Sequence, residues 1–105
     1  MAAKPGEVWL ADLGLAAKTR PVVVLSRDDP QAPRQLVTYV PLTTQNRASR
    51  YEIELGRPRF LTEISVANVQ GIGSIPAIRL QRRLGSVSTE ILEKIKQAIR
   101  FALDL

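Results

Sequence analysis

The stretch Lys18–Asp28, "KTRPVVVLSRD", places an Arg-Pro pair directly before four apolar residues and a second arginine after them. Because residues 21–26, "PVVVLS", are rich in β-branched side chains and do not alternate, we expect a strand covered on both faces. Pro21 restricts the residue before it to extended conformations, so Arg20 should leave the strand start in a fixed direction. Taken alone, an arginine at a strand start is most often an ordinary exposed residue. Its importance therefore depends on what the rest of the chain places beside it.

Further strands are expected on both sides of this segment, separated by turn-forming residues. They cover residues 7–13, 36–43, 50–55, 62–70 with a short extension at 71–77, and 82–87. Residues 50–55 alternate between apolar and charged side chains, which indicates a half-exposed antiparallel strand. Pro41 cannot donate a ladder hydrogen bond, so it should mark an edge, a bulge or the end of its strand. Strands this short and closely spaced predict a small barrel or sandwich.

The last part of the chain changes to helical periodicity. Residues 89–103, "TEILEKIKQAIRFAL", place apolar side chains along one stripe at helical spacing. Ser88 is a suitable N-cap, and Val87 and Leu92 are placed for a hydrophobic staple. Since a stripe of this kind usually faces a core, we expect one helix that covers the barrel. The predicted fold is mainly β with a C-terminal α-helix.

Length and composition restrict the possible functions. The 105 residues leave room for one domain, residues 1–105, and the chain has neither cysteine nor histidine. Disulfides, thiol chemistry and the usual general base near neutral pH are therefore excluded. No segment resembles a signal peptide or reaches the ~18 apolar residues of a membrane span, so we expect a cytoplasmic protein without membrane contact. The net charge of +5 makes nucleic acid a candidate partner.

Arginine is the side chain that remains for a functional site. The sequence has no phosphate-binding glycine loop, no histidine for a serine triad and no carboxylate cluster of the kind that holds a hard metal ion. Eleven of the fifteen basic residues are arginines, whose planar guanidinium suits bidentate contact with phosphate. They gather at Arg20 and Arg27, at Arg47, Arg50, Arg57 and Arg59, and at Arg79, Arg82 and Arg83. Trp9 and Tyr51 could either stack on bases or belong to the core.

Five segments, taken in order, resemble those of one protein family. They are "PGEVWLADL" (5–13), "RPVVVLSRD" (20–28), "VPLTT" (40–44), "ISVANVQGIGSIPAIRL" (64–80) and "RLGSVSTEILEKIKQAI" (83–99). Together they resemble the MazF/PemK toxins of bacterial toxin–antitoxin systems across nearly the whole chain. The resemblance implies a Src-homology-3-like barrel with a C-terminal helix, which forms a homodimer.

The resemblance also implies an activity and a set of residues. Similar toxins are endoribonucleases that need neither a metal nor a cofactor and cut single-stranded messenger RNA at short sequences. They leave a cyclic phosphate and a 5′-hydroxyl, and a cognate antitoxin protein silences them. Their catalytic pair matches Arg20 and Thr43 in this sequence. Residues expected to bind RNA around this pair are Lys18, Thr19, Thr44, Gln45, Arg47, Arg50, Gln70 and Ser74.

Two segments differ from the family pattern. The connection between the first two strands is only Gly14–Thr19, where related toxins often have a longer polar loop. Further along, Gly73 stands where an arginine is expected, and Ser74 and Pro76 replace a threonine and an aspartate. Because a fold does not decide function, two other functions stay open. One is a module that holds RNA or an antitoxin without cutting, and the other is a poison of a protein target such as DNA gyrase.

Overall fold

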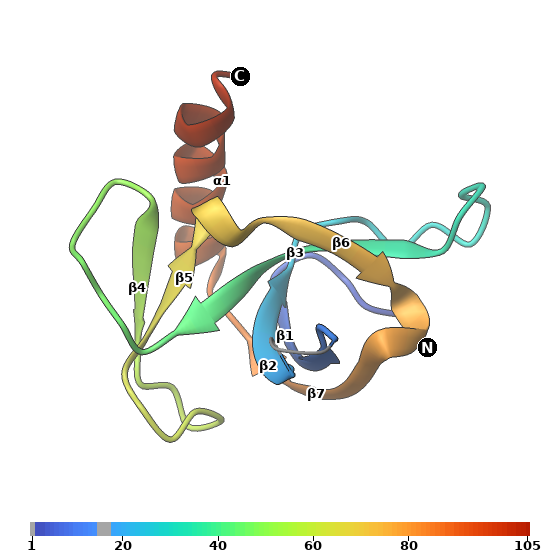
Figure 1. The fold of residues 1–105 in the computed structure, drawn as a ribbon, viewed down its shortest axis with the longest axis horizontal. Helices are drawn as coiled ribbons and strands as arrows, with labels where there is room; N and C mark the ends of the chain where they lie inside the picture. Colours follow the sequence, from blue (N-terminus) through green and yellow to red (C-terminus); the bar gives the residue numbers. More distant parts are fainter. Residues whose placement is uncertain (1, 15–17) are drawn as a thin grey trace.

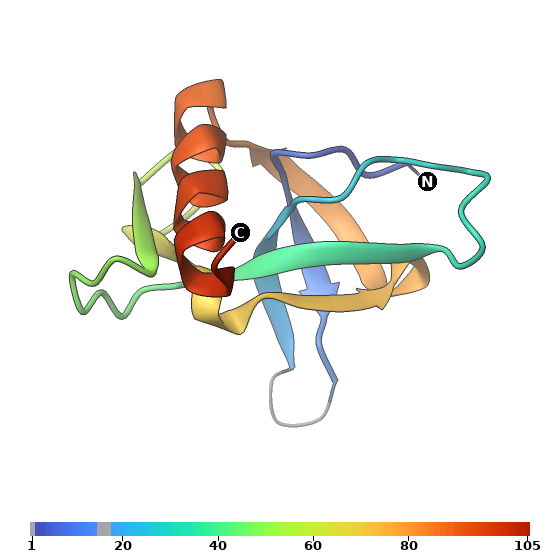
Figure 2. The same ribbon diagram turned by 90° about the horizontal axis from the view of Figure 1, so that it is seen from above.

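The computed structural model describes residues 2–14 and 18–105, which form a curled antiparallel sheet with one α-helix (Figure 1; Figure 2). The described strands are β1 (Glu7–Asp12), β2 (Thr19–Val24), β3 (Leu36–Thr43), β4 (Glu52–Gly56), β5 (Ser65–Asn68), β6 (Gly73–Pro76) and β7 (Leu80–Ser86), and the helix is α1 (Thr89–Leu103). The predicted mainly β fold with a C-terminal helix is confirmed. Within the described residues, no helix has the length and apolar character that crossing a membrane requires.

β3 is the central strand of the sheet. The strands follow the order β4-β5-β3-β2-β1-β7, and β6 pairs with β3 as well. Tyr39 is paired with both Val24 of β2 and Gly73 of β6, so β2 and β6 lie on opposite edges of β3. Further along its length, β3 pairs with β5. Because β3 is hydrogen-bonded on both sides, Pro41 does not mark a sheet edge; it is the last residue of β3 in the ladder with β2.

The sheet separates two apolar clusters. Cluster 1 is surrounded by β1, β2, β3, β6 and β7 and consists of Ala3, Trp9, Ala11, Val22, Val24, Val37, Ile75 and Leu80. Cluster 2 lies between the sheet and α1 and consists of Val8, Val23, Val40, Leu42, Ala67, Val69, Ile95 and Ala98. Val22 and Val24 belong to cluster 1 and Val23 to cluster 2, and all three are fully buried. The predicted burial of this strand on both faces is confirmed.

Strand boundaries differ from the predicted ones where pairing overrides local composition. β2 begins at Thr19, two residues before the predicted start, because β1 extends the ladder back to the pair Asp12↔Thr19. The strand predicted at 62–70 is reduced to β5. It ends at Asn68, whose side chain accepts the backbone N–H of Gln70 at 3.1 Å and starts a turn of 3-10 helix. These two corrections depend on hydrogen bonds that composition does not encode.

α1 has the predicted bounds and the predicted cap. The Ser88 hydroxyl accepts the backbone N–H of Ile91 at 3.1 Å, which satisfies one of the N–H groups left unpaired at a helix start. Ile95 and Ala98 on the apolar face are buried in cluster 2. At the other end, Asp104 stops the helix in a left-handed conformation with a φ of 55°. Both views show α1 standing over the side of the sheet that contains β4 and β5 (Figure 1; Figure 2).

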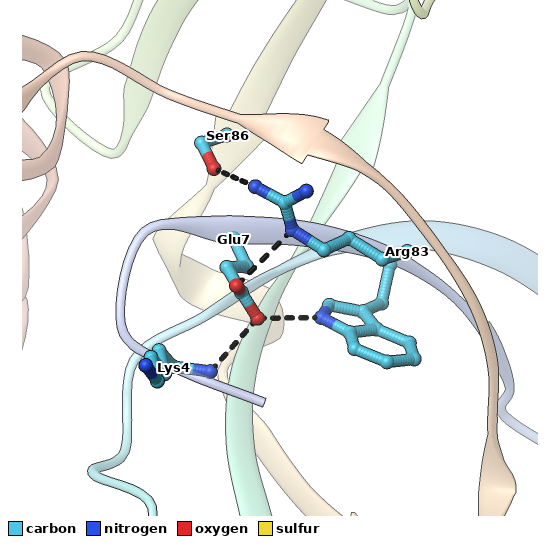
Figure 3. Close-up of polar contacts among 5 residues, drawn as sticks. Lys4, Glu7, Arg83 and Ser86 are labelled. Carbon is cyan, nitrogen blue, oxygen red and sulfur yellow. Dashed lines mark hydrogen bonds and ion pairs between the residues drawn. The ribbon is translucent and has the colours of Figure 1, made fainter. Parts of the chain in front are cut away.

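One carboxylate joins the N-terminal segment to β7. Glu7 Oε1 accepts hydrogen bonds from the backbone N–H of Lys4 (2.9 Å) and from the indole N–H of Trp9 (3.0 Å). The other oxygen lies 3.1 Å from Nε of Arg83, whose guanidinium also donates to the Ser86 hydroxyl at 2.8 Å (Figure 3). Trp9 is buried in cluster 1, so its indole belongs to the core and not to a surface on which bases stack.

Glu7→Gln should lower the free energy of unfolding by about 1–3 kcal/mol at neutral pH, because an amide cannot replace the carboxylate at all of its donors. Partial burial acts to raise the pKa of Glu7, but hydrogen bonds from Lys4 and Trp9 and the nearby guanidinium charge outweigh it, leaving the pKa below its ordinary value of 4.5. The carboxylate therefore stabilises the fold fully above pH 4.5, and this contribution is lost as the pH falls through the lowered pKa. Urea denaturation of both proteins at neutral and acidic pH measures the difference, and a gap that does not shrink in acid would contradict it.

Candidate functional site

Arg20 lies near the start of β2, at the end of a rigid strand. It is exposed, whereas Val22, two residues further along, is fully buried. Its backbone is paired with Ala11 of β1, and Pro21 restricts it to an extended conformation. The strand therefore fixes the point and direction from which the Arg20 side chain leaves the backbone.

Thr43 is the last residue of β3 and is half-buried. Its backbone is paired with Val66 of β5, and its Oγ1 accepts the backbone N–H of Gln45 at 3.2 Å. A threonine hydroxyl that accepts one hydrogen bond still has its own proton to donate. Thr43 can therefore shape the start of the following loop and donate to a ligand at the same time.

Arg20 and Thr43 lie at the same end of the β2–β3 pair. The ladder between these strands ends at Val22↔Pro41, and each of the two residues is two positions beyond that pair. Side chains two positions apart in a strand lie on the same face, so both share the face of Val22, which belongs to cluster 1. α1 packs on cluster 2, on the opposite face. Beyond Pro41, β3 is paired with residues of β5 and no longer with residues of β2. The Thr43 hydroxyl and the Arg20 guanidinium therefore come from two strands that are not paired with each other at this point.

Several predicted RNA contacts are neighbours of this pair in the chain. Four of them, all exposed, are Lys18, Thr19, Thr44 and Gln45. In the segment Gly14–Thr19, predicted to be a short connection, residues 15–17 lie outside the described residues. Arg47 is exposed in the loop that joins β3 to β4, and Gln70 is exposed in the turn of 3-10 helix after β5.

The structure does not bring Ser74 beside Arg20. Ser74 of β6 is paired with Thr38 of β3, and their hydroxyl oxygens are 3.3 Å apart. Thr38 is two positions from Val40, which belongs to cluster 2, so Ser74 and Thr38 share the face that α1 covers further along the sheet. Within one chain, Ser74 therefore lies on the opposite face from the Arg20–Thr43 pair.

Arg50 is engaged by the C-terminal helix. Its guanidinium carbon lies 3.6 Å from the centre of the Phe101 ring, a cation–π arrangement. The Phe101 ring in turn packs on Tyr51, with 5.4 Å between the ring centres. Tyr51 thus belongs to the contact between sheet and helix, and Arg50 anchors the end of the β3–β4 loop to α1.

The Tyr39 side chain, opposite Gly73, leaves little room for a side chain at position 73. The β3–β6 register pairs Gly73 with Tyr39, and a Cβ atom at position 73 would lie 2.9 Å from the phenol oxygen. Real Cβ atoms essentially never come so close to another heavy atom, so the end of the Tyr39 side chain would have to shift to admit a residue other than glycine. Tyr39 therefore takes the space beside position 73, where the family pattern has an arginine.

Sequence reasoning missed a second carboxylate, that of Glu52. It accepts hydrogen bonds from the hydroxyl (2.7 Å) and backbone N–H (3.0 Å) of Ser49 and from the backbone N–H of Arg47 (3.1 Å). The Ser49 hydroxyl, together with these backbone N–H groups, holds the pKa of Glu52 below its ordinary value. The spacing Ser-x-x-Glu is the signature of a reciprocal capping box. That signal was available in the sequence, although here it closes a turn and does not start a helix.

Across residues 2–14 and 18–105, no group of three or more potential ligand side chains is placed to hold a metal ion.

Comparison with known proteins places the chain in a family. The model of the PemK-like, MazF-like toxins of type II toxin–antitoxin systems matches residues 4–103. Endoribonuclease MazF9 of Mycobacterium tuberculosis is 34% identical over 113 residues, covering 95% of this chain and 95% of that protein. The solved Mycobacterium tuberculosis toxin MazF-mt6 has a TM-score of 0.82 and 28% identity, covering 94% of this chain and 97% of its own. An endoribonuclease from a mycobacterial species, solved in complex with its cognate antitoxin, has a TM-score of 0.84 and 27% identity, covering 99% and 97%.

The match of the family model to nearly all of the sequence agrees with the likeness of the fold to these solved structures. The chain belongs to the PemK-like, MazF-like toxins of type II toxin–antitoxin systems.

Proposed function

We propose that this chain is an endoribonuclease that cuts single-stranded messenger RNA in the cytoplasm without a metal ion, as the toxin of a toxin–antitoxin pair. The observation that carries this function is the placement of Arg20 and Thr43 at one end of one sheet face, on strands whose buried residues hold them rigidly. MazF9, at 34% identity, is named an endoribonuclease, which supports the same activity here. The net charge of +5 favours a polyanionic substrate.

The chemistry suits these two residues because RNA supplies its own nucleophile. The 2′-oxygen attacks the adjacent phosphorus, the bond from phosphorus to the 5′-oxygen breaks, and a cyclic phosphate and a 5′-hydroxyl result. Solvent takes the proton of the 2′-hydroxyl and returns one to the 5′-oxygen. Arg20 would contact the phosphoryl oxygens through its guanidinium fork, and Thr43 would donate one neutral hydrogen bond. Both would stabilise the charge that develops in the transition state. Arginine stays protonated in proteins, so Arg20 has no role as a base.

Two protein partners belong to this function. One is a second copy of the chain, so that a homodimer receives the RNA. The other is a cognate antitoxin that blocks the same surface, as expected for a chain similar to an endoribonuclease solved with its antitoxin. In the homodimer, residues such as Ser74 could approach the RNA from the second copy, although they lie away from Arg20 within one chain.

Mapping of the 5′ ends produced on a long, mixed-sequence RNA in the presence of a chelator tests this function. We expect discrete new 5′-hydroxyl ends at a short recurring sequence, which would establish cleavage, metal independence and specificity together. RNA that stays intact while binding weakens steeply with salt would select a module that holds RNA without cutting. Growth arrest with intact messenger RNA and a trapped topoisomerase would select a gyrase poison.

Thr43→Val should lower the rate of RNA cleavage about 100-fold, at the lower end of the range for loss of a transition-state donor, because the hydroxyl gives a single neutral hydrogen bond. Valine keeps the shape of the side chain, but it can neither donate to RNA nor accept the backbone N–H of Gln45. Thr43→Ser keeps the hydroxyl and is the matched control, which should retain most of the activity. Single-turnover rates of the two variants measure the difference, and equal rates would exclude Thr43 from the reaction.

A further inference from the structure

The loop between β3 and β4, residues 44–51, is built around one carboxylate. Both oxygens of Glu52, the first residue of β4, are occupied by hydrogen bonds from Arg47 and Ser49 at 2.7–3.1 Å. The Ser49 hydroxyl also accepts the backbone N–H of Tyr51 at 3.2 Å. The backbone N–H groups of Arg47 and Ser49 and the Ser49 hydroxyl are therefore all directed toward the Glu52 carboxylate.

Asn46 holds the middle of the same loop. Its Oδ1 accepts the backbone N–H of Ala48 at 2.8 Å, and its Nδ2 donates to Glu54 at 3.0 Å. Ala48 has a φ of 55°, in the left-handed region that non-glycine residues rarely adopt. The loop therefore has one defined shape, which polar contacts maintain against a local backbone cost.

Burial does not account for the defined shape of this loop. Residues 44–50 are all exposed, so these hydrogen bonds replace hydrogen bonds to water and add little to the stability of the fold. Fixing a loop before a ligand arrives does increase affinity, because less conformational entropy is then lost on binding. The loop begins next to Thr43 and exposes Arg47, whose guanidinium suits a phosphate oxygen pair.

We propose that Glu52 is a positioning residue for RNA binding: its carboxylate fixes the 44–51 loop so that Arg47 meets the RNA backbone beside the scissile phosphate. This role rests on the RNA cleavage proposed above. Because Glu52 is itself an anion, its direct electrostatic effect on RNA opposes binding. Loss of its charge would therefore tighten binding if charge alone mattered and weaken binding if the loop matters. The sign of the effect separates the two explanations.

The test is the steady-state cleavage of a single-stranded RNA that contains the mapped cleavage sequence, with KM and kcat determined separately. Glu52→Gln should raise KM roughly three- to tenfold, the range expected when a loop side chain must be ordered on binding, and leave kcat nearly unchanged. Glu54→Gln, two residues along the same strand, removes the same charge but keeps an oxygen to accept from Asn46. Its KM should be equal to or lower than that of the wild type.

Four further variants test the route by which Glu52 would act. Ser49→Ala should raise KM in the same direction as Glu52→Gln, whereas Ser49→Thr keeps the hydroxyl and should restore the wild-type value. If Glu52 acts through Arg47, the double variant Glu52→Gln/Arg47→Ala should bind RNA no more weakly than Arg47→Ala alone. Additive losses in the double variant would overturn the proposed route through Arg47.

Binding of an uncleavable 2′-O-methyl RNA of mixed sequence is measured in parallel, so the Kd of each variant is obtained whether or not the wild type cuts. If the wild-type protein leaves RNA intact, the proposed function is overturned. The role of Glu52 in binding is then decided by comparing the Kd of Glu52→Gln with that of the wild type. A wild type that cuts, together with unchanged KM and Kd in Glu52→Gln, would overturn the role of Glu52 alone.

Discussion

Arg20→Ala is expected to lower the rate of RNA cleavage by roughly 100- to 1000-fold, toward the upper end of that range because a charged, bidentate donor is lost. The fold should survive, since Arg20 is exposed at a strand end and substitutions at such sites usually change the free energy of unfolding by less than about 0.5 kcal/mol. Single-turnover cleavage and thermal unfolding of the same preparation measure both quantities.

Two controls test whether the loss of cleavage is specific to position 20 and whether it depends on the planar shape of the guanidinium group. Arg27→Ala removes the same charge beyond the other end of β2, where the side chain is also exposed, and should cleave RNA at nearly the wild-type rate. Arg20→Lys keeps the charge but loses the planar fork, so an intermediate rate is expected. If Arg20→Ala and Arg27→Ala were equally active, Arg20 would not be at the scissile phosphate.

Ile95→Ala should have the largest effect on stability, lowering the free energy of unfolding by about 2–5 kcal/mol. Ile95 is the largest fully buried side chain of α1 and lies in cluster 2 with residues from β1, β2 and β3. Truncation would leave a cavity between helix and sheet that neighbouring β-branched side chains cannot fill without leaving their rotamers. Urea denaturation followed by circular dichroism measures the loss.

The matched control is Ile78→Ala, which deletes the same atoms from a side chain that is 88% exposed. It should change the free energy of unfolding by less than about 0.5 kcal/mol. Ile95→Val should lie between the two, at about 0.5–1.5 kcal/mol. Equal stability of Ile95→Ala and Ile78→Ala would mean that α1 does not seal the core on this face of the sheet.

The best sequence predictions were those decided by local interactions. β3 and α1 have the predicted bounds, 36–43 and 89–103. A helix is specified by the spacing of its apolar residues and by an N-cap side chain that accepts a backbone N–H three residues later. Both signals can be recognised in a short segment of sequence. Val23 is buried on one face of the sheet, and Val22 and Val24 are buried on the other. An apolar run without alternation likewise predicts this burial on both faces.

Predictions failed where a distant segment sets the outcome. The start of β2 at Thr19 depends on its pairing with β1, which extends the strand back beyond the apolar run. The sequence also does not reveal that, within one chain, Ser74 lies on the face opposite the Arg20–Thr43 pair, because this depends on the register of β6 with β3. A register shift of one residue exchanges the faces of a strand, and composition alone does not specify register.

The mainly β fold with its C-terminal helix, the buried strand that follows Arg20 and the family to which the chain belongs all follow from the sequence alone. That Arg20 and Thr43 share one end of one face follows only from the folded chain, because it depends on where the β2–β3 ladder stops. The same holds for the adjoining loop that Glu52 maintains, because the hydrogen bonds that converge on its carboxylate exist only once the turn before β4 has formed.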